Sequence, residues 1–596
     1  MCRIAGIYNN SWTNEQLQAS VQQMCDVLQH GGPDDGGIYN ATNAALVLGN
    51  RRLALLDLTS AGHQPMHYQQ RYTITYNGEL YNFTTLKNEL IGLGHTFSNH
   101  TDTEVILAAF AQWHTAAFAK FNGMFAFALW DAVTQELFLV RDKMGIKPLY
   151  YALENEALYF ASEVRAFASL SFLQAPFTNA PIYQMAYGFI PEPFTTKAAV
   201  KMLPKGCYLK MAIASGTHSI QNYYFLPFGN GLTQSAIAEQ EIKNSVTNAV
   251  ARQQIADAPL GVFLSGGIDS SILALLAANN RTQPLHTLSI YFDDAQYSEQ
   301  PFQQLIADTI KSEHHPILLK EADFHAYFET VLHAMDMPSC DGINTWFISK
   351  FAKEQGLKAV LSGIGADELF GGYPSFHRIQ KAMHLQSLPA GVLKNVGKFA
   401  GQKYNRIGYL KIKDIRGLYL FLRGHFAPDE IAAHLGAYEA DVWKVLEQYS
   451  VMPQLENMDS KNVASWLELT IYMKNQLLRD ADVMSMANSI EIRVPFLDDA
   501  VVNTALQIEA SVKYAGTKPK QILINSFNDI LPTAIWDRPK MGFSFPFQQW
   551  LQNSPFIKEL AHHHNNATKN AYNAFKSGSL HWSKVLSLLH IKKHFS

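Results

Sequence analysis

The sequence LGVFLSGGIDSSILALLA, residues 260–277, carries the strongest structural signal in the chain. Its first five residues form a short apolar run that predicts a buried parallel strand, and the apolar positions within 272–276 predict the inner face of a helix. Between the two lies SGGIDSS. A strand that passes into a helix through paired glycines leaves several backbone N–H groups unpaired, with the positive end of the helix dipole behind them. The stretch therefore predicts a loop that binds phosphate oxygens.

This loop carries an acid and no lysine. It differs from the GxxxxGK[ST] nucleotide loop and contains Asp269 instead. A carboxylate repels phosphate unless a cation lies between them, so Asp269 predicts a bridging Mg²⁺. An isolated SGG would suit a Gly-Ser turn of any doubly wound sheet, but the full SGGxDSS resembles the pyrophosphate loop of the ATP pyrophosphatase superfamily. Further contacts are expected from the loop's glycines, which admit a close anion, and from its serine hydroxyls: Ser265, Gly266, Gly267, Ser270 and Ser271.

Composition limits the classes of function. At 596 residues the chain is too long for a single hydrophobic core. Hydrophobic residues make up 47% and charged residues 17%, which is the balance of a soluble globular protein. A net charge of −3 gives no reason to expect nucleic acid as a partner. No apolar run approaches the roughly 18 residues of a transmembrane helix. We therefore expect several domains and no membrane.

The N-terminus and the cysteines point to the cytoplasm. MCRIAGIYNN lacks an apolar secretory segment and a small-residue cleavage site. Cys2, Cys25, Cys207 and Cys340 form no CxxC motif, which indicates reduced thiols. Removal of Met1 would give Cys2 a free α-amine, with a reference pKa of about 7.7–8.0, that could accept the proton of its own thiol. Taken alone, a cysteine is more often an inert buried thiol.

Sequence blocks in the first third of the chain favour a reactive Cys2 over an inert thiol. LGNRRLALLDL (48–58) predicts a strand with two arginines at its entry, and ITYNGELYNF (74–83) predicts two strands joined by a hairpin turn at Asn77-Gly78. Both resemble the glutamine amidotransferase domain of the N-terminal nucleophile class. The other matching blocks, in the same order, are HGGPDDGG (30–37), AGHQPM (61–66), TDTEVI (101–106), FNGMFAFALWD (121–131), RDKMGIKPLYY (141–151) and ASE (161–163).

The resemblance implies a pocket for glutamine. Glutamine presents an α-carboxylate, an α-ammonium and a side-chain amide, so its pocket needs a cation, an anion and donors for an oxyanion. Arg52 would bind the carboxylate, and Glu79 and Asp102 would bind the ammonium. Outside the motif, Arg52 or Asp102 would suggest only a surface ion pair.

The resemblance also implies an oxyanion hole for attack by Cys2, formed by Asn77 and the N–H of Gly78. One departure lies nearby. The family usually has HRGPD where this chain has HGGPD, with Gly31 in place of the arginine. Loss of this arginine would affect the rigidity of the loop or the affinity for glutamine. It does not affect Cys2 itself.

A second half follows a linker rich in Gly, Pro and Asn, which includes FLPFGNGLTQ. We expect a glutaminase domain over residues 1–215, a linker over 216–235, a synthetase domain over 236–560 and a partly mobile tail over 561–596. A helix is expected over 235–253. The tail contains AHHHNNATKN and has low apolar content. Its adjacent histidines would point about 100° apart on a helix, so they do not form a good metal site alone.

Two more parallel strands are expected at LHTLSIYF (285–292) and KAVLSG (358–363), with an amphipathic helix over 297–310. The second strand leads into IGADELFGGYPSF (364–376), again glycines followed by an acid. Asp367 would share Mg²⁺ with Asp269, because loops at the carboxyl ends of parallel strands form one crevice. Alone, DELFGG would also fit a helix N-terminus stabilised by acids. The resemblance implies nucleotide contacts from Leu264, Ser265, Gly266, Gly267, Asp269, Ser270, Ile290 beside the adenine, Ser362 and Gly363.

Two later motifs match the same family. NQLLRDADVMSMANSIEIRVPFLD (475–498) resembles the segment that closes the acceptor pocket, and RPKMGFSFP (538–546) contains Lys540, the candidate cation facing the α-phosphate during adenylation. The matched positions of the first motif are Asp482, Ser485, Met486, Glu491 and Arg493. Asp482 and Arg493 fit a buried structural pair equally well.

Together these blocks resemble glutamine-hydrolysing asparagine synthetase from Cys2 to about Leu551. The resemblance implies an N-terminal αββα sandwich followed by a doubly wound parallel-sheet α/β domain with extra helices. It implies ATP and Mg²⁺ as cofactors, and glutamine, ATP and aspartate as substrates. It also allows a homodimer. Ammonia released at Cys2 would need an apolar passage to the second site.

The acceptor remains open because the family usually reads SGEGxDE and this chain has Ile364 at the glutamate. The chain could be a branch of asparagine synthetases that uses an aliphatic residue there. It could instead amidate another carboxylate, on a sugar, a peptide or a secondary metabolite. A third reading is a non-catalytic module that binds glutamine or nucleotide. That reading predicts damage to Cys2, Asp269 or Asp367, and all three are present.

Overall fold

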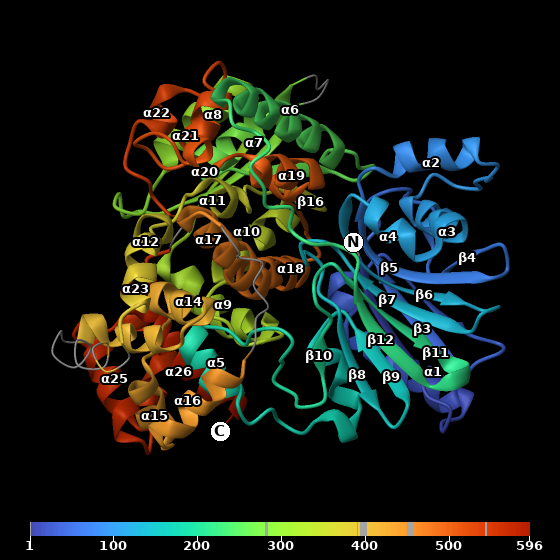
Figure 1. Cartoon of the computed structure of the whole chain (residues 1–596), viewed down its shortest axis with the longest axis horizontal. Coiled ribbons are helices and arrows are strands. Elements are labelled where there is room, and N and C mark those ends of the chain that lie inside the picture. The colour runs from blue at the N-terminus through green and yellow to red at the C-terminus, as the bar shows by residue number, and fades with distance from the viewer. Residues whose placement is uncertain are drawn as a thin grey trace.

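The computed structural model describes residues 2–279, 284–389, 391, 393, 402–449, 458–542 and 545–595. The chain folds into two parts that lie side by side (Figure 1). The first part, blue to teal, contains two antiparallel sheets with helices outside them. The second part, green to red, contains a parallel sheet among many helices. The expected fold class is therefore confirmed.

The N-terminal part is a four-layer αββα sandwich. Its first sheet has the order β10-β8-β9-β1-β3-β2, with bounds Lys201–Met202, Tyr150–Glu154, Ala157–Ala161, Cys2–Tyr8, Leu46–Arg52 and Asp35–Asn40. Its second sheet has the order β12-β11-β7-β6-β5-β4, with bounds Thr217–Asn222, Cys207–Ala212, Glu136–Arg141, Gly123–Asp131, Tyr72–Leu80 and Met66–Tyr68. Four helices accompany the sheets: α1 (Asn14–Val27), α2 (Phe83–Gly92), α3 (Asp102–Trp113) and α4 (Ala117–Lys120).

Strand β1 is buried on both faces. Ile4 and Tyr8 belong to the core between the two sheets, whereas Ala5 and Ile7 belong to the core that packs against α1. A strand covered on both faces is apolar throughout and does not alternate. This explains why the first residues of the chain carry no amphipathic pattern.

The hairpin predicted at Asn77-Gly78 is wrong. Strand β5 continues through both residues, and they pair with Ala126 and Phe125 of β6. A Cβ at Gly78 would lie 2.2 Å from the carbonyl oxygen of Met124, so the glycine permits close approach to the neighbouring strand. The pairing along the sheet overrides the local turn preference. The two arginines of 48–58 also lie at the end of β3 and not at its entry.

The second part is built on a five-stranded parallel sheet of order β15-β14-β13-β16-β17. The bounds are Glu313–Leu318, His286–Tyr291, Leu260–Phe263, Ala359–Leu361 and Glu491–Arg493. The three strands expected from sequence are confirmed as β13, β14 and β16. From β13 the chain adds β14 and β15 on one side of the sheet, and it then adds β16 and β17 on the other side. The carboxyl ends of β13 and β16 therefore form a topological switch point, which is where ligands bind in open α/β sheets.

Helices enclose this sheet. Those nearest in sequence are α6 (Ser235–Gln253), α7 (Ile268–Ala278), α8 (Gln300–Ile310), α9 (Glu321–Ala334), α10 (Ile343–Glu354), α11 (Ala366–Phe370) and α12 (Ser375–Gln386). The later ones are α14 (Ile415–Arg423), α15 (Pro428–Leu435), α16 (Glu439–Gln448), α17 (Ser460–Leu467), α18 (Leu478–Met486) after a π-helical turn, α19 (Asp499–Gln507), α20 (Ala510–Lys513), α21 (Gln521–Ser526), α22 (Thr533–Trp536), α23 (Phe547–Asn553) and α24 (Lys558–Ala561). Among the described residues, every helix is too short or too polar to span a membrane.

One expected boundary differs from the structure. Strand β12 pairs with β11, so the second sheet extends to Asn222, beyond the boundary expected at residue 215. Helix α6 does begin at Ser235, as expected.

The C-terminal stretch is folded where we expected a partly mobile tail. It forms α25 (Asn566–Lys576) and α26 (Trp582–Phe595), with Phe575, Val585 and Leu586 fully buried. Helix α26 packs against α5 (Ala180–Tyr187) from the first half of the chain. The sequence did not predict this packing, because residues 561–570 contain few apolar side chains.

Candidate active sites

The first candidate site surrounds Cys2, the first residue of β1. Cys2 is 6% exposed and pairs with Arg52 of β3 in the sheet register. A cavity of about 30 Å³ lies beside it, and its lining includes Arg52, Gly78, Glu79 and Asp102. Asn77 contacts Cys2 directly, because the backbone N–H of Cys2 donates to Asn77 Oδ1 at 3.2 Å. The structure thus brings together all the residues that the sequence assigned to glutamine.

Backbone carbonyls fix the guanidinium of Arg52. Its Nη1 donates to Thr59 O at 2.9 Å, and its Nη2 donates to Leu56 O at 3.2 Å and to Asp57 O at 2.5 Å. A Cβ at Gly62 would lie 1.9 Å from Arg52 Nη2, so the glycine of the AGHQPM block leaves room for this side chain. The result is a rigid, positively charged wall that suits a carboxylate.

Asn77 presents an unused donor. Its Nδ2 is buried and has no hydrogen-bond partner in the described structure. Leaving a buried donor unpaired costs about 1–3 kcal/mol. Such a cost is expected where a ligand supplies the missing acceptor, as the oxyanion of an attacked amide would.

Two buried acids form the opposite wall. Asp102 Oδ2 accepts from Tyr76 Oη at 2.9 Å and from the Leu80 N–H at 2.8 Å. Burial raises the pKa of both Asp102 and Glu79. Arg493, from the second part of the chain, lies 3.4 Å from Glu79 Oε1 and opposes this shift. A cationic ligand between the acids would keep both ionised, which is what an ammonium group supplies.

The second candidate site is a cavity of about 1040 Å³ at the carboxyl ends of β13, β14 and β16. Its lining includes Leu264, Ser265, Gly267, Asp269, Ser270, Ile290, Ser362, Gly363, Asp367 and Lys540. Of the nucleotide and phosphate contacts expected from sequence, two are not part of this lining: Ser271, which is fully buried in α7, and Gly266. Its carbonyl accepts from Arg538 Nη2 at 2.8 Å, and its φ of +81° is a value that favours glycine.

The two glycine loops touch each other. Within the first loop, the Ser265 N–H donates to Ser270 Oγ at 3.2 Å, and helix α7 begins at Ile268. From the second loop, Gly363 approaches so closely that a Cβ there would lie 2.8 Å from the Cβ of Asp269. The glycine at 363 therefore permits the contact between the loops.

Asp269 and Asp367 converge on one cation. Lys520 Nζ lies 2.7 Å from both carboxylate oxygens of Asp269 and 2.8 Å from Asp367 Oδ1. Lys540 Nζ lies 2.7 Å from both oxygens of Asp367. Although burial opposes ionisation, the two lysines lower the pKa of Asp367 to about 2. Two carboxylates are thus held within reach of a single positive charge, at the switch point of the sheet.

Sequence reasoning missed three side chains of this cavity. Lys520 has a side chain only 3% exposed and comes from a loop before α21, where a lysine is normally solvated. Glu368 follows Asp367, and burial raises its pKa to about 7 while Tyr373 Oη donates to its Oε1 at 2.8 Å. Burial likewise raises the pKa of Asp480 to about 7. Two short charged motifs in the sequence could have indicated Lys520 and Glu368, namely KPK at 518–520 and DE at 367–368.

The segment 475–498 contributes Leu477, Asp480 and Ile492 to this cavity, but its matched residues Asp482, Ser485, Met486, Glu491 and Arg493 are not part of the lining. Asp482 binds Arg3 Nη1 at 2.7 Å and Lys147 Nζ at 2.7 Å, both from the N-terminal part. Two positions along a helix differ by about 200°, so Asp480 lines the cavity and Asp482 faces away from it. Ser485 and Met486 are buried in α18.

Arg493 also lies at the junction of the two parts. It binds Glu491 at 2.5 Å and approaches Glu79 beside the Cys2 cavity, so Asp482 and Arg493 both form buried ion pairs but do not pair with each other. Gly31 belongs to the same junction, since a Cβ there would lie 2.7 Å from Arg3 Cγ. Of the RPKMGFSFP motif, Phe543 and Ser544 lie outside the described residues.

Fold and sites together define a class of protein. An N-terminal cysteine in an αββα sandwich, joined to a parallel sheet with two acidic glycine loops, is the arrangement of a glutamine-dependent amidotransferase coupled to an ATP-using ligase. Residues 1–224 match the family model of the glutamine amidotransferase domain, and residues 241–589 match that of asparagine synthase.

Known proteins identify the family. The chain is 31% identical to asparagine synthetase [glutamine-hydrolyzing] 1 of Bacillus subtilis over 93% of this chain and 88% of that protein. It is 30% identical to a putative asparagine synthetase [glutamine-hydrolyzing] of Mycobacterium tuberculosis over 91% and 86% of the two chains. It is 25% identical to amidase chry2 of Gibberella zeae over 92% and 88%. The chain belongs to the glutamine-hydrolysing asparagine synthetase family and is a carbon–nitrogen ligase that uses ATP.

Proposed function

We propose that this protein converts aspartate to asparagine, using glutamine as the nitrogen donor and ATP as the energy source. Glutamine and water give glutamate and ammonia at Cys2. Aspartate and ATP give aspartyl adenylate and pyrophosphate in the large cavity. Ammonia then displaces AMP to give asparagine. The convergence of Asp269 and Asp367 from two glycine loops is the observation that supports this proposal most directly.

The glutaminase step needs a base close to Cys2. Burial raises the pKa of the thiol, so the resting thiol is neutral. Asn77 Oδ1 lies 3.2 Å from the Cys2 nitrogen and would orient the α-amine once Met1 is removed. The amine would take the thiol proton as Sγ attacks the amide carbon, and Asn77 Nδ2 and the Gly78 N–H would bind the oxyanion.

The adenylation step needs cations around the triphosphate. Asp269 and Asp367 would hold Mg²⁺, because their carboxylate oxygens already converge on one cation and oxygen is the ligand that Mg²⁺ prefers. That ion would neutralise the departing pyrophosphate. Lys540 would face the α-phosphate as the acceptor oxygen attacks it, and Ser265, Gly267 and Ser270 would bind the phosphates. Ile290 would lie against the adenine.

Three buried acids of the cavity support an acceptor that carries an ammonium group. Glu368, Asp341 and Asp480 are part of its lining, and burial raises the pKa of all three. An amino group there would offset their burial, and the α-ammonium of aspartate provides one. Glu368 would also supply a carboxyl beside Ile364, which cannot transfer a proton.

One apolar cluster reaches both cavities. Leu53 and Leu55 line the glutamine pocket, Leu264 and Ile492 line the large cavity, and all four belong to the same hydrophobic core. We propose that ammonia crosses through this core. An apolar path disfavours protonation, so the nucleophile would arrive neutral.

A second candidate function is amidation of a different carboxylate. Two observations favour it: Ile364 replaces the family glutamate, and the fungal relative at 25% identity is named an amidase. The same cavity and loops would carry out this reaction, and only the acceptor would change.

One experiment separates these possibilities. Purified protein is incubated with glutamine, Mg-ATP and single carboxylates, namely aspartate, glutamate, a sugar acid and a peptide, while pyrophosphate, AMP and amidated product are followed. Pyrophosphate release that depends on aspartate, with asparagine as product, is the expected result. Release only with another acid supports the second function. No release with any acid would overturn the ligase proposal and leave a module that binds glutamine or nucleotide.

A further inference from the structure

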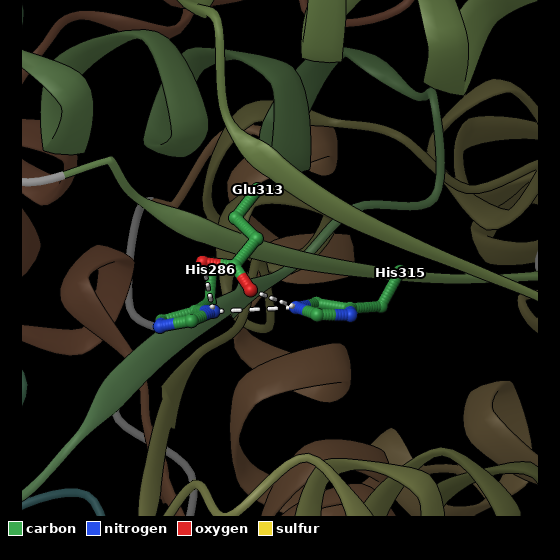
Figure 2. Close-up of side chains that lie close together, drawn as sticks. All are labelled: His286, Glu313 and His315. Carbon is green, nitrogen blue, oxygen red and sulfur yellow. Dashed lines mark hydrogen bonds and ion pairs between the residues drawn. The ribbon is translucent and has the colours of Figure 1, made fainter.

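Three metal-ligating side chains meet on the parallel sheet, away from both active sites. His286 is the first residue of β14, and Glu313 and His315 lie at the start of β15. They are therefore near the amino ends of the strands, whereas the nucleotide cavity lies at the carboxyl ends. Figure 2 shows the two imidazole rings and the carboxylate pointing toward one another.

The strand register places the three side chains on one face. His286 pairs with Glu313 across the parallel strands, and His315 follows Glu313 by two residues. Because the side-chain period of a strand is two, Glu313 and His315 project to the same side. His314 projects to the other side, where its Nδ1 lies 2.9 Å from Thr287 Oγ1. This geometry follows from the backbone and needs no flexible loop.

The distances within the cluster leave room for a metal ion. His286 Nδ1 lies 3.2 Å from His315 Nε2, which is within hydrogen-bond distance. Glu313 does not complete a hydrogen-bond network, because its Oε2 lies 3.6 Å from His286 Nδ1 and its Oε1 lies 3.8 Å from His315 Nε2. One ligand atom from each residue lies within 4.8 Å of the other two. Tetrahedral Zn²⁺, with bonds of about 2.0–2.1 Å, separates its ligand atoms by roughly 3.3 Å, so a small shift of the exposed Glu313 side chain would bring the three atoms to one ion.

We propose that His286 Nδ1, His315 Nε2 and the Glu313 carboxylate bind one divalent transition metal, preferably Zn²⁺. Two imidazoles and one carboxylate favour Zn²⁺ over the oxygen-preferring Mg²⁺ and Ca²⁺. Three protein ligands leave a fourth position for water. Glu313 has a side chain 57% exposed, so the metal can enter from solvent.

The metal would join two neighbouring strands. Strand β15 lies at the edge of the sheet, and β14 lies between it and β13. At its other end β14 supplies Leu288, Ser289 and Ile290 to the nucleotide cavity. A metal that links the amino ends of β14 and β15 would therefore stabilise the sheet that carries the adenine-binding wall, without contact with the substrates.

The test uses the full chain without an affinity tag, treated with a chelator and returned to excess Mg²⁺ so that the acidic site at Asp269 and Asp367 is occupied. Co²⁺ is titrated while the visible absorption of four-coordinate cobalt is followed, and Zn²⁺ is then added to displace it. We expect one tight equivalent per chain and a rise in thermal midpoint of a few degrees with Zn²⁺. No tight equivalent in the wild-type protein would overturn the proposal.

Variants locate the site. His286→Gln and His315→Gln should each weaken binding at least tenfold, whereas His314→Gln, one position away on the opposite face, should leave it unchanged. A variant with His562, His563 and His564 replaced by Gln should also keep the tight equivalent. Equal loss in the His314 variant, or loss in the triple variant, would contradict the assignment.

A measurement on the wild-type protein tests the site even if the variants fail to fold. Diethyl pyrocarbonate modifies accessible imidazoles, and peptide mass mapping locates the modified residues. Zn²⁺ should protect His286 and His315 and leave the modification of His333, which has a side chain 67% exposed, unchanged. Modification of His286 and His315 that is the same with and without Zn²⁺ would refute the site.

Discussion

At the scale of single residues, the front pocket depends on Cys2 and on the unpaired amide of Asn77. Burial makes the thiol a poor acid, and Asn77 holds the backbone nitrogen that would deprotonate it. Arg52, Glu79 and Asp102 supply one cation and two acids around the same small cavity. Each residue type was predictable, because the charges of glutamine dictate the charges of its pocket.

Cys2→Ala should abolish the use of glutamine and spare synthesis from free ammonium, since the second cavity is intact. Product formation with each nitrogen source measures this directly. Cys25→Ala is the matched control. Burial raises the pKa of the Cys25 thiol to about 12, and this residue belongs to α1 and lies in the core that packs against the first sheet, so both activities should remain. Loss of both activities in Cys2→Ala would contradict the division into two sites.

Asp480 should make stability depend on pH. Burial raises its pKa to about 7, against the opposing effect of Arg479, so the folded protein binds a proton that the unfolded chain has released. This contribution to stability is complete below the unfolded pKa of about 3.9 and is lost as the pH rises through about 7. The thermal midpoint of Asp480→Asn should therefore fall less than that of the wild type between pH 5 and pH 7. Parallel curves for the two proteins would refute this.

At the scale of elements, the strand-to-helix turns were predictable and the long-range contacts were not. The apolar run at 260–264 and the helix after it appear where the pattern placed them. The Asn77-Gly78 hairpin failed because β6 pairs with β5 along its whole length. Tail helices α25 and α26 were missed because the low apolar content of residues 561–570 was taken for the whole tail, although α26 is half apolar and its partners lie elsewhere in the chain.

Gly363→Val should separate the two glycine loops. The new side chain would meet the Cβ of Asp269 at 2.8 Å, so Asp269 and Asp367 could no longer share one cation. Adenylation, measured as acceptor-dependent pyrophosphate release, should fall at least tenfold while glutamine hydrolysis persists. Gly92→Ala, where the added Cβ has no neighbour within 4 Å, should change neither. Adenylation at the wild-type rate in Gly363→Val would show that the loop contact is unnecessary.

At the scale of the whole molecule, buried ion pairs join the two parts beside Cys2. Arg3, next to Cys2 in β1, binds Asp482 of α18, and Arg493 approaches Glu79 in the lining of the Cys2 cavity. The sequence motif identified Asp482 and Arg493, but their roles could not be derived from it. Periodicity does not show which face of α18 meets the N-terminal part.

Asp482→Asn should destabilise the protein strongly. It leaves the buried charges of Arg3 and Lys147 without their shared partner, and breaking such a pair typically costs about 3–5 kcal/mol. The midpoint of denaturant unfolding measures the loss. Glu559→Gln, which removes the exposed pair with Lys592, should cost about 0–1 kcal/mol. Equal effects of the two substitutions would show that the buried network does not hold the parts together.

The central claim is that Asp269 and Asp367 act together in adenylation. Exchange of labelled pyrophosphate into ATP, measured with saturating acceptor in the wild type, Asp269→Asn, Asp367→Asn and the double variant, tests it most directly. We predict a loss of at least a hundredfold in each single variant and little further loss in the double variant, with glutamine hydrolysis retained in all of them. Exchange at the wild-type rate in either single variant would contradict the account.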